Sequence, residues 1–365
     1  MIEDFELTRI IVPLLEWYRE NKRALPWREN QDAYGVWVSE IMLQQTRVEA
    51  VIPYYKRFMQ ALPTIPSLAE CGENQLLKLW EGLGYYNRVR NMQIAARTIE
   101  QDYGGVFPGS YEQMIQLKGI GSYTGGAIAS IAYGEPVPAV DGNVLRIIAR
   151  VCGDDWDIAK QATKKRTEGY LREIMPKKMP GDFNQALMEL GATVCVPNGE
   201  PNCSRCPWNT MCRTHELGAY ANYPVKKKPE KRKIEERTVL LIKRGDEILL
   251  IKRPEKGLLS GLFEFPNRKG YLSRDEAVEE VRKLCLHPLR IMELADSKHI
   301  FSHIEWHMKG YLIRVDDLDC VSQQLLFASV KDVEEKYTIP TAFKRYTAYM
   351  KIRLGNERFK GEEIL

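Results

Sequence analysis

The chain has 365 residues, 44% of them hydrophobic, which is enough for two domains that each bury a core. No apolar run approaches the length of a membrane span, and the N-terminus opens on acidic residues rather than on the basic stretch of a secretory signal. The formal net charge of +4 is too small to indicate a nucleic-acid partner by itself. These features exclude a transmembrane protein and predict a cytoplasmic one.

The N-terminal part of the chain reads as a series of amphipathic helices separated by Gly and Pro. Helical patterns cover residues 5–18, 36–45, 76–80, 89–99, 127–131, 144–151, 159–174 and 183–194. Pro13 predicts a kink or a restart in the first of them. We therefore expect an all-α domain over residues 1–222.

A basic segment follows the predicted helices. Between Lys226 and Arg237, seven Lys or Arg stand against three Glu, and this net charge of +4 equals the surplus of the whole chain. The segment has little to bury, so we place a linker at residues 223–237. A solvated linker and a DNA-contacting one explain the charge equally well.

The pattern changes beyond the linker. Two apolar, β-branched runs, Thr238–Ile242 and Glu247–Ile251, flank Arg244-Gly245-Asp246 and predict a β-hairpin. A helical pattern at residues 277–284 and strand-like segments around Ile300 and Tyr311–Val315 follow. We expect a smaller α+β domain over residues 238–365.

Four cysteines lie within eighteen residues, in the pattern Cys195-x7-Cys203-x2-Cys206-x5-Cys212. In a reducing compartment such a cluster indicates metal binding rather than disulfides, and four thiolates suit zinc or an iron–sulfur cluster. Zinc sites usually combine two CxxC pairs, and only one is present here. The spacing resembles the [4Fe–4S] loop of endonuclease III-type glycosylases, although the first gap in that family is most often six residues.

A glycine-rich turn precedes a single aspartate. Gly119 and Gly121 permit a tight turn with exposed N–H groups at a helix N-terminus, which can bind a phosphate oxygen, although an ordinary helix–helix loop has the same pattern. Asp141 follows eighteen residues after Tyr123, in Val140-Asp141-Gly142-Asn143, and is also suited to cap a helix.

Together these segments resemble the helix-hairpin-helix and catalytic loop of the endonuclease III superfamily. The resemblance implies that Gly119 and Gly121 bind DNA and that Asp141 stabilises the cation left on the deoxyribose. Bifunctional members carry a Lys at the position of Tyr123, and its amine forms a Schiff base with the sugar. Tyr123 therefore implies a monofunctional, hydrolytic enzyme.

Glu40 lies on the apolar face of the predicted helix 36–45, where it is either a solvated edge residue or a buried acid with a raised pKa. Its segment resembles the adenine DNA glycosylase (MutY) family, in which this Glu is the general acid. Three further segments resemble the same family: Leu25–Arg28, Trp80–Tyr86 and Phe183–Gly191. Taken together, they favour the buried acid.

The resemblance also implies roles for other residues. Tyr123 and Asn143 accompany Asp141 at the sugar. The pocket for the extruded adenine is lined by Arg23, Trp27, Arg28, Leu43, Gln185 and Met188, since the bond cannot be reached inside the duplex. The opposite base meets Gln45, Thr46, Leu83 and Tyr85.

The segment Ile248–Pro266 resembles the Nudix-like C-terminal domain of the same family. Glu279-Glu280 lacks the Arg-Glu pair that a Nudix hydrolase needs ahead of it, so the fold implies recognition rather than hydrolysis. Phe301-Ser302-His303 resembles the loop that reads 8-oxoguanine, and the Ser302 hydroxyl can both donate and accept hydrogen bonds. Alternatively, Phe301 is a core residue and His303 a surface one.

The sequence therefore predicts a helix-hairpin-helix glycosylase with a [4Fe–4S] cluster and a Nudix-like domain. Its predicted substrate is adenine paired with 8-oxoguanine or guanine in duplex DNA, and we expect it to act as a monomer at the nucleoid. Three alternatives remain: an endonuclease III-type glycosylase/lyase, a Nudix nucleotide pyrophosphohydrolase, and a non-enzymatic DNA-binding protein stabilised by a metal.

Overall fold

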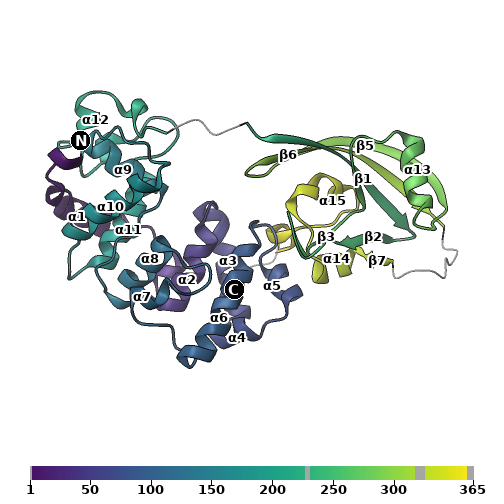
Figure 1. Cartoon of the computed structure of the whole chain (residues 1–365), viewed down its shortest axis with the longest axis horizontal. Coiled ribbons are helices and arrows are strands. Elements are labelled where there is room, and N and C mark those ends of the chain that lie inside the picture. The colour runs from purple at the N-terminus through teal and green to yellow at the C-terminus, as the bar shows by residue number, and fades with distance from the viewer. Residues whose placement is uncertain (1, 227–230, 317–324, 360–365) are drawn as a thin grey trace. The chain divides into compact units, whose positions relative to one another are not determined.

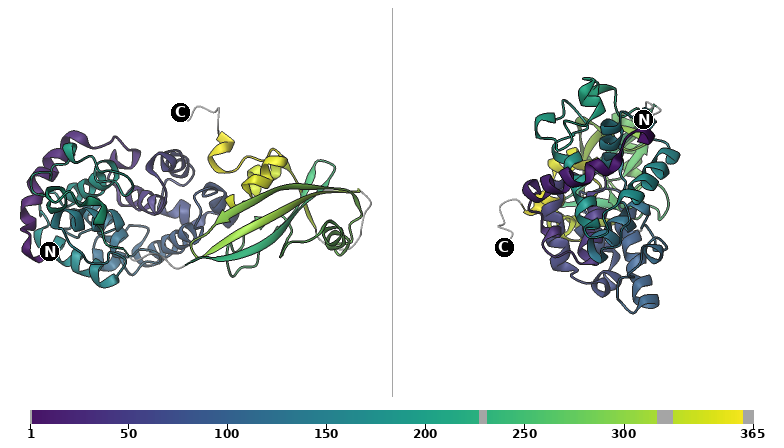
Figure 2. Two further views of the ribbon diagram at one scale, coloured as in Figure 1. Left: turned by 90° about the horizontal axis from the view of Figure 1, so that it is seen from above. Right: turned by 90° about the vertical axis from the view of Figure 1, so that its left-hand side faces the viewer.

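The computed structural model describes residues 2–226, 231–316 and 325–359. The chain divides into two compact units, Met1–Glu70 with Arg90–Pro229 and Cys71–Val89 with Glu230–Leu365. In Figure 2 the helices of the first unit run from purple to teal, and the long green strands belong to the second unit. Within the described residues, no helix is both long and apolar enough to cross a bilayer.

The described elements of the first unit are α-helices and short 3-10 turns (Figure 1). The α-helices are α1 Ile11–Asn21, α2 Ala33–Leu43, α3 Val48–Ala61, α4 Ile65–Glu70, α6 Asn87–Tyr103, α7 Tyr111–Met114, α8 Ser122–Tyr133, α9 Gly142–Cys152, α10 Gln161–Ile174, α11 Pro180–Thr193 and α12 Arg213–Glu216. The predicted all-α class is confirmed.

Two prolines show how local sequence sets these helices. Pro13 lies in the first turn of α1, where an N–H would have no helical partner, so the helix begins at Ile11 rather than kinking. Pro53 lies inside α3, a helix that our sequence analysis missed. Its signal was present, because Val51, Tyr54 and Phe58 keep a helical spacing and are buried.

One core of the first unit packs α1, α9 and α11 together, with Leu14, Ile148 and Leu187 buried in it. Trp208, from the cysteine loop, is buried in the same core, and its indole N–H donates to the Ile10 carbonyl at 3.1 Å. This contact anchors the cysteine loop to the helices.

The second unit is built on a mixed sheet with the strand order β3-β2-β1-β6-β5, to which β4 and β7 add. Its elements are α5 Glu73–Leu79, β1 Lys233–Arg244, β2 Glu247–Lys252, β3 Phe263–Glu264, β4 Asn267–Lys269, α13 Arg274–Arg282, β5 Pro288–Ile300, β6 Ile304–Val315, β7 Leu326–Ser329, α14 Val330–Lys336 and α15 Lys344–Tyr349. Strands β1 and β6 are parallel, whereas the other pairs are antiparallel. The predicted α+β class is confirmed.

Alternate residues of β1 enter two different cores. Val239 and Leu241 pack with residues of α14 and α15, whereas Leu240 and Ile242 pack with residues of α13. A sheet covered on both faces explains why this strand is continuously apolar rather than alternating.

Two predictions about β1 have different outcomes. The predicted hairpin is confirmed, because Arg244 pairs with Glu247 around the turn. However, β1 begins at Lys233, inside the segment that we expected to be a linker. Its first residues pair with β6 from Ile304 onward through backbone hydrogen bonds, which require no apolar side chains.

Candidate active site and cysteine loop

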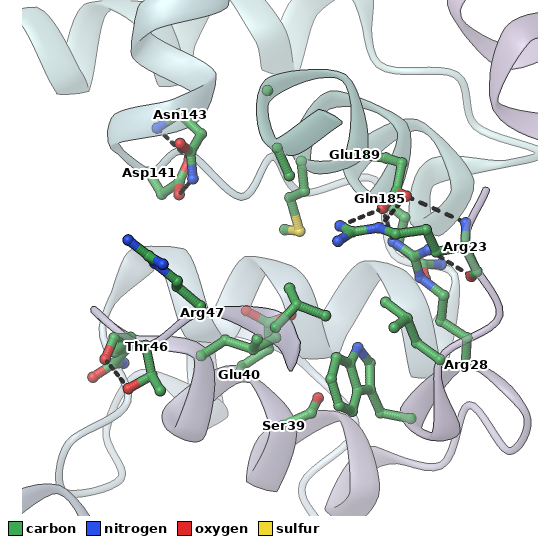
Figure 3. Close-up of a pocket in the computed structure, with 18 of the residues that line it drawn as sticks. Arg23, Arg28, Ser39, Glu40, Thr46, Arg47, Asp141, Asn143, Gln185 and Glu189 are labelled. Atoms are coloured by element: carbon green, nitrogen blue, oxygen red, sulfur yellow. Dashed lines mark hydrogen bonds and ion pairs between the residues drawn. The ribbon is translucent and has the colours of Figure 1, made fainter. Parts of the chain in front are cut away.

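A pocket of about 880 Å³ opens in the first unit between α2, the starts of α8 and α9, and α11 (Figure 3). The residues predicted for the adenine pocket and for catalysis line it together, as do two of those predicted to meet the opposite base. These lining residues are Arg23, Trp27, Arg28, Glu40, Leu43, Gln45, Thr46, Tyr123, Asp141, Asn143, Gln185 and Met188.

Glu40 is a buried acid rather than a solvated edge residue. It is only 5% exposed, because α2 is buried from Ala33 to Met42. Burial raises the pKa of its carboxyl to about 7; a hydrogen bond from Tyr123 and the charge of Arg28 lower this pKa, whereas the charge of Asp141 raises it. Among the described residues, none makes a hydrogen bond to its Oε2 atom. Glu40 can therefore hold a proton near neutral pH.

Asp141 is the N-cap of α9, as its position in the sequence suggested. Its Oδ1 atom accepts from the N–H groups of Asn143 and Val144 at 2.9 and 2.8 Å, and Oδ2 accepts from the Asn143 side chain at 2.8 Å. These bonds hold the carboxyl group in one orientation at the pocket wall.

Tyr123 lies at the start of α8 and lines the same pocket as the two acids. Burial raises the pKa of its phenol well above 10, and the charges of Glu40 and Asp141 raise it further. The hydroxyl therefore stays protonated and donates to Glu40. It also lies 3.8 Å from the sulfur of Met188.

Glu189 is a pocket residue that our sequence analysis did not single out. Arg23 donates from Nε at 2.6 Å and from Nη2 at 3.1 Å, and Arg28 donates from Nη2 at 2.8 Å. Burial raises the pKa of the Glu189 carboxyl, but the two arginines outweigh burial and lower it. A lone acid in the apolar run of α11, like Glu40 in α2, was the signal that could have identified it.

The glycine-rich turn has the expected conformation. Gly119 has φ +82°, and a Cβ there would lie 2.8 Å from the Cβ of Asn91, so two constraints require glycine. Gly121 is the N-cap of α8 and offers no side chain to its first N–H groups. The helix N-terminus is therefore open to an anion.

The four predicted metal ligands line one small cavity of about 30 Å³ in the first unit. The extra residue of the first gap is absorbed in a turn, where Gly199 has φ +79° and the Asn202 N–H bonds to the Val194 carbonyl at 3.0 Å. The Arg150 guanidinium lies 3.3 Å from the Cys195 sulfur and would stabilise a thiolate there. Among the described residues, no three His, Cys, Asp or Glu converge on a single-ion site. The four sulfurs stand around the cavity instead.

Arg146 joins the cysteine loop to the wall of the pocket that carries Asn143 and Asp141. Its guanidinium donates to the Cys195 carbonyl at 3.0 Å, to the Gly191 carbonyl at 2.8 Å and to the Asn143 side chain at 3.0 Å. Asn143 in turn donates to Asp141, so the loop and the carboxylate share one hydrogen-bond network.

The other predicted recognition residues lie in the second unit. Phe301-Ser302-His303 forms the turn between β5 and β6, where Ile300 pairs with Glu305. Phe301 packs on Trp306 with ring centroids 4.9 Å apart, whereas Ser302 and His303 are exposed. The Ser302 hydroxyl lies 3.1 Å from that of Tyr85, which is 50% exposed, whereas Leu83 is buried.

Comparison with known proteins places the chain in a family. Residues 38–177 match the HhH-GPD superfamily of base excision DNA repair proteins, and residues 237–349 match the NUDIX domain. The chain is 36% identical over 361 residues to the adenine DNA glycosylase of Mus musculus, covering 83% of this chain and 70% of the relative. It is also 36% identical over 305 residues to that of Buchnera aphidicola subsp. Acyrthosiphon pisum, covering 83% and 85%. The chain belongs to the adenine DNA glycosylase family.

It is therefore a base excision repair enzyme that acts on DNA, as the sequence predicted. A solved endonuclease III–DNA complex has the same helical fold, with a TM-score of 0.51 and 22% identity, covering 59% of this chain and 98% of that one. The enzyme class, the family and the two-part fold are thus confirmed. The roles of individual residues and the domain boundaries stay predictions.

Proposed function

We propose that this glycosylase hydrolyses the N-glycosidic bond of adenine paired with 8-oxoguanine or guanine in duplex DNA, acting as a monomer at the nucleoid. One observation carries the proposal. A buried carboxyl whose pKa is about 7, that of Glu40, lines the same pocket as the oriented carboxylate of Asp141. Two acids with such different environments can take the two roles that glycosidic cleavage needs.

The first role is protonation of the leaving base. Adenine leaves poorly as an anion, so a proton donor at its N7 lowers the barrier. The base must first rotate out of the duplex into the pocket. There Trp27 and Leu43 offer apolar surface, and Glu189 holds Arg23 and Arg28 in place as hydrogen-bond donors. Glu40, half protonated near neutral pH, then transfers its proton.

The second role is stabilisation of the sugar cation. The Asp141 carboxylate is fixed by backbone N–H groups and by Asn143, so it needs no reorganisation when positive charge develops. Tyr123 occupies the position of the lyase nucleophile, and a phenol cannot form a Schiff base with the sugar. Water therefore completes the reaction, and the enzyme is monofunctional.

Residues that take no part in bond cleavage recognise the DNA. The Gly119–Gly121 turn binds a backbone phosphate. Gln45 and Thr46 from the first unit, and Tyr85 and the Phe301-Ser302-His303 turn from the second, read the base opposite adenine. Leu83 is buried and supports the turn that carries Tyr85. The Ser302 hydroxyl suits the N7–H and O8 groups that distinguish 8-oxoguanine from guanine.

The Nudix-like domain serves recognition rather than pyrophosphate hydrolysis. Its two adjacent acids on α13 are occupied by ion pairs, Glu279 with Arg282 at 2.5 Å and Glu280 with Arg268 at 2.5 Å. No Arg-Glu pair precedes them in this domain, so the set of acids that holds magnesium in a Nudix hydrolase is incomplete.

The four cysteines hold a [4Fe–4S] cluster in this proposal. Four thiols around one cavity, with Arg150 beside Cys195 and Trp208 packed beneath, fit the ligand set of such a cluster. When bound, the cluster supplies covalent cross-links that fix the loop, and through Arg146 it supports the wall that carries Asn143 and Asp141. Purified anaerobically, the enzyme should be brown; a colourless, zinc-loaded protein would contradict this assignment.

Single-turnover excision tests the proposal, on duplexes with adenine opposite 8-oxoguanine, guanine or thymine. We expect the order 8-oxoguanine, guanine, thymine from fastest to slowest. Glu40→Gln and Asp141→Asn should abolish excision and leave duplex binding intact, whereas Glu112→Gln, at an exposed acid, serves as the control. Near-normal turnover in either active-site variant, or borohydride trapping of an adduct, would contradict the mechanism.

A further inference from the structure

The segment Cys71–Val89 belongs to the second unit, although it lies between two segments of the first in the sequence. It contains α5 and the turn that carries Leu83 and Tyr85. Gly82, Gly84 and Tyr85 in this turn have φ values of +104°, +70° and +48°. A non-glycine residue keeps such a conformation only where its surroundings impose it.

Part of the constraint comes from within the segment. The Trp80 indole N–H donates to the Gly84 carbonyl at 3.1 Å. Arg88 donates from Nη2 to the carbonyls of Leu83 and Gly84, both at 3.1 Å. These bonds give the turn its shape, but they do not attach it to the rest of the unit.

Glu81, the residue before the turn, makes that attachment. Its side chain is fully buried, and its two oxygens accept from the N–H groups of Ile339 at 3.0 Å and Gly355 at 3.1 Å. Lys78 donates to the same carboxylate at 2.8 Å, and the Nε atom of Arg358 lies 3.7 Å from it. One carboxylate thus binds two separate stretches of the C-terminal part of the chain.

Lys78 makes the reciprocal attachment from α5. It is 6% exposed, and its ammonium group donates to the carbonyls of Val333 at 2.9 Å and Tyr337 at 3.0 Å. A buried ion pair is a poor source of stability, because both charges must be desolvated. Its directed hydrogen bonds do, however, specify one arrangement of the groups that they join.

We propose that Glu81 is a positioning residue for recognition of the base opposite adenine. Its buried carboxylate holds the turn at Gly82–Tyr85 against the part of the second unit that also carries Ser302. Tyr85 and Ser302, whose hydroxyls lie 3.1 Å apart, then read the base as one rigid pair. The inference rests on the proposed recognition of 8-oxoguanine and extends it to a residue that touches no DNA.

Glu81→Gln tests the inference in the full-length protein, because it removes the charge and keeps the shape. We expect the preference for 8-oxoguanine over guanine opposite adenine to fall about tenfold, the equivalent of one hydrogen bond to a charged group. Single-turnover excision opposite guanine at saturating enzyme should stay unchanged. Asp332→Asn removes a more exposed ion pair with Lys336 in the same unit and is the matched control.

Hydrogen exchange supplies a readout besides activity. In Glu81→Gln, peptides covering residues 80–86 and 333–358 should exchange faster together, while those covering 36–44 and 141–152 in the first unit keep wild-type rates. If Glu81→Gln loses protection throughout β1 and β6, the second unit has unfolded. Lys78→Met then replaces it, because it removes the ammonium group that joins the Glu81 carboxylate to the carbonyls of Val333 and Tyr337. The same losses of preference and of protection from exchange are expected.

Ser302→Ala separates the two proposals. If it leaves the preference for 8-oxoguanine intact, the proposed recognition itself is wrong. Suppose instead that Ser302→Ala lowers the preference for 8-oxoguanine. If the folded Glu81→Gln or Lys78→Met variant then keeps both the wild-type preference and the wild-type hydrogen exchange, only the positioning role of Glu81 is overturned.

Discussion

Replacing Glu40 by Gln should abolish excision and at the same time stabilise the first unit at alkaline pH. The buried carboxyl has no hydrogen bond to its Oε2 atom among the described residues, and burial raises its pKa to about 7 from an ordinary 4.5. Ionisation of this group is therefore harder in the folded enzyme than in the unfolded chain. Gln keeps the shape of the side chain and cannot ionise.

The size of the effect follows from the difference in pKa between the two states. Each pKa unit corresponds to about 1.4 kcal/mol, so an ionised Glu40 costs the folded state about 3 kcal/mol. Below pH 4.5 the carboxyl is protonated in both states and costs nothing. The cost grows as pH rises through the window from 4.5 to about 7 and is complete above it.

Urea unfolding of wild type and Glu40→Gln between pH 4.5 and 8.5 measures this cost, with amide exchange in α2 reporting on the first unit. The variant should gain about 3 kcal/mol over wild type between the two ends of that range. Excision by wild type should fall as pH rises through about 7. A difference in stability that is the same at every pH would refute the argument that Glu40 is a desolvated acid.

Three further variants test neighbouring parts of the site. Asp141→Asn should lower single-turnover excision by at least about a hundredfold and change the free energy of unfolding by less than about 1 kcal/mol, because Asn also caps helices. Tyr123→Phe removes a hydrogen bond that lowers the pKa of Glu40, so the alkaline limb of the excision profile should move to higher pH. Gly119→Ala should weaken duplex binding more than Gly121→Ala, as measured by fluorescence anisotropy, because only Gly119 has a positive φ and a crowded Cβ position.

Local patterns in the sequence predicted much of the fold. Hydrophobic periodicity identified most of the helices, and two apolar runs around Gly245 identified the β1–β2 hairpin. These features depend on neighbours within a few residues, which is the range that periodicity and turn chemistry report. The missed helix α3 carried the same signal, obscured by Pro53.

The site was predicted by resemblance rather than by pattern. For Glu40, the helical spacing alone favoured a solvated edge, and only the packing of α2 makes it a buried acid with a raised pKa. Glu189 and its bonds to Arg23 and Arg28 join residues more than 160 positions apart, which local spacing cannot report.

The sequence by itself determined which residues belong together as motifs: the acids, the paired glycines, the cysteine cluster and the Phe301-Ser302-His303 turn. Tertiary structure alone decided to which of the two units each motif belongs. Residues 71–89 are part of the second unit because Glu81 bonds to Ile339 and Gly355, 258 and 274 positions later. Such pairings depend on how whole elements pack, and neither partner carries a local signal of the other.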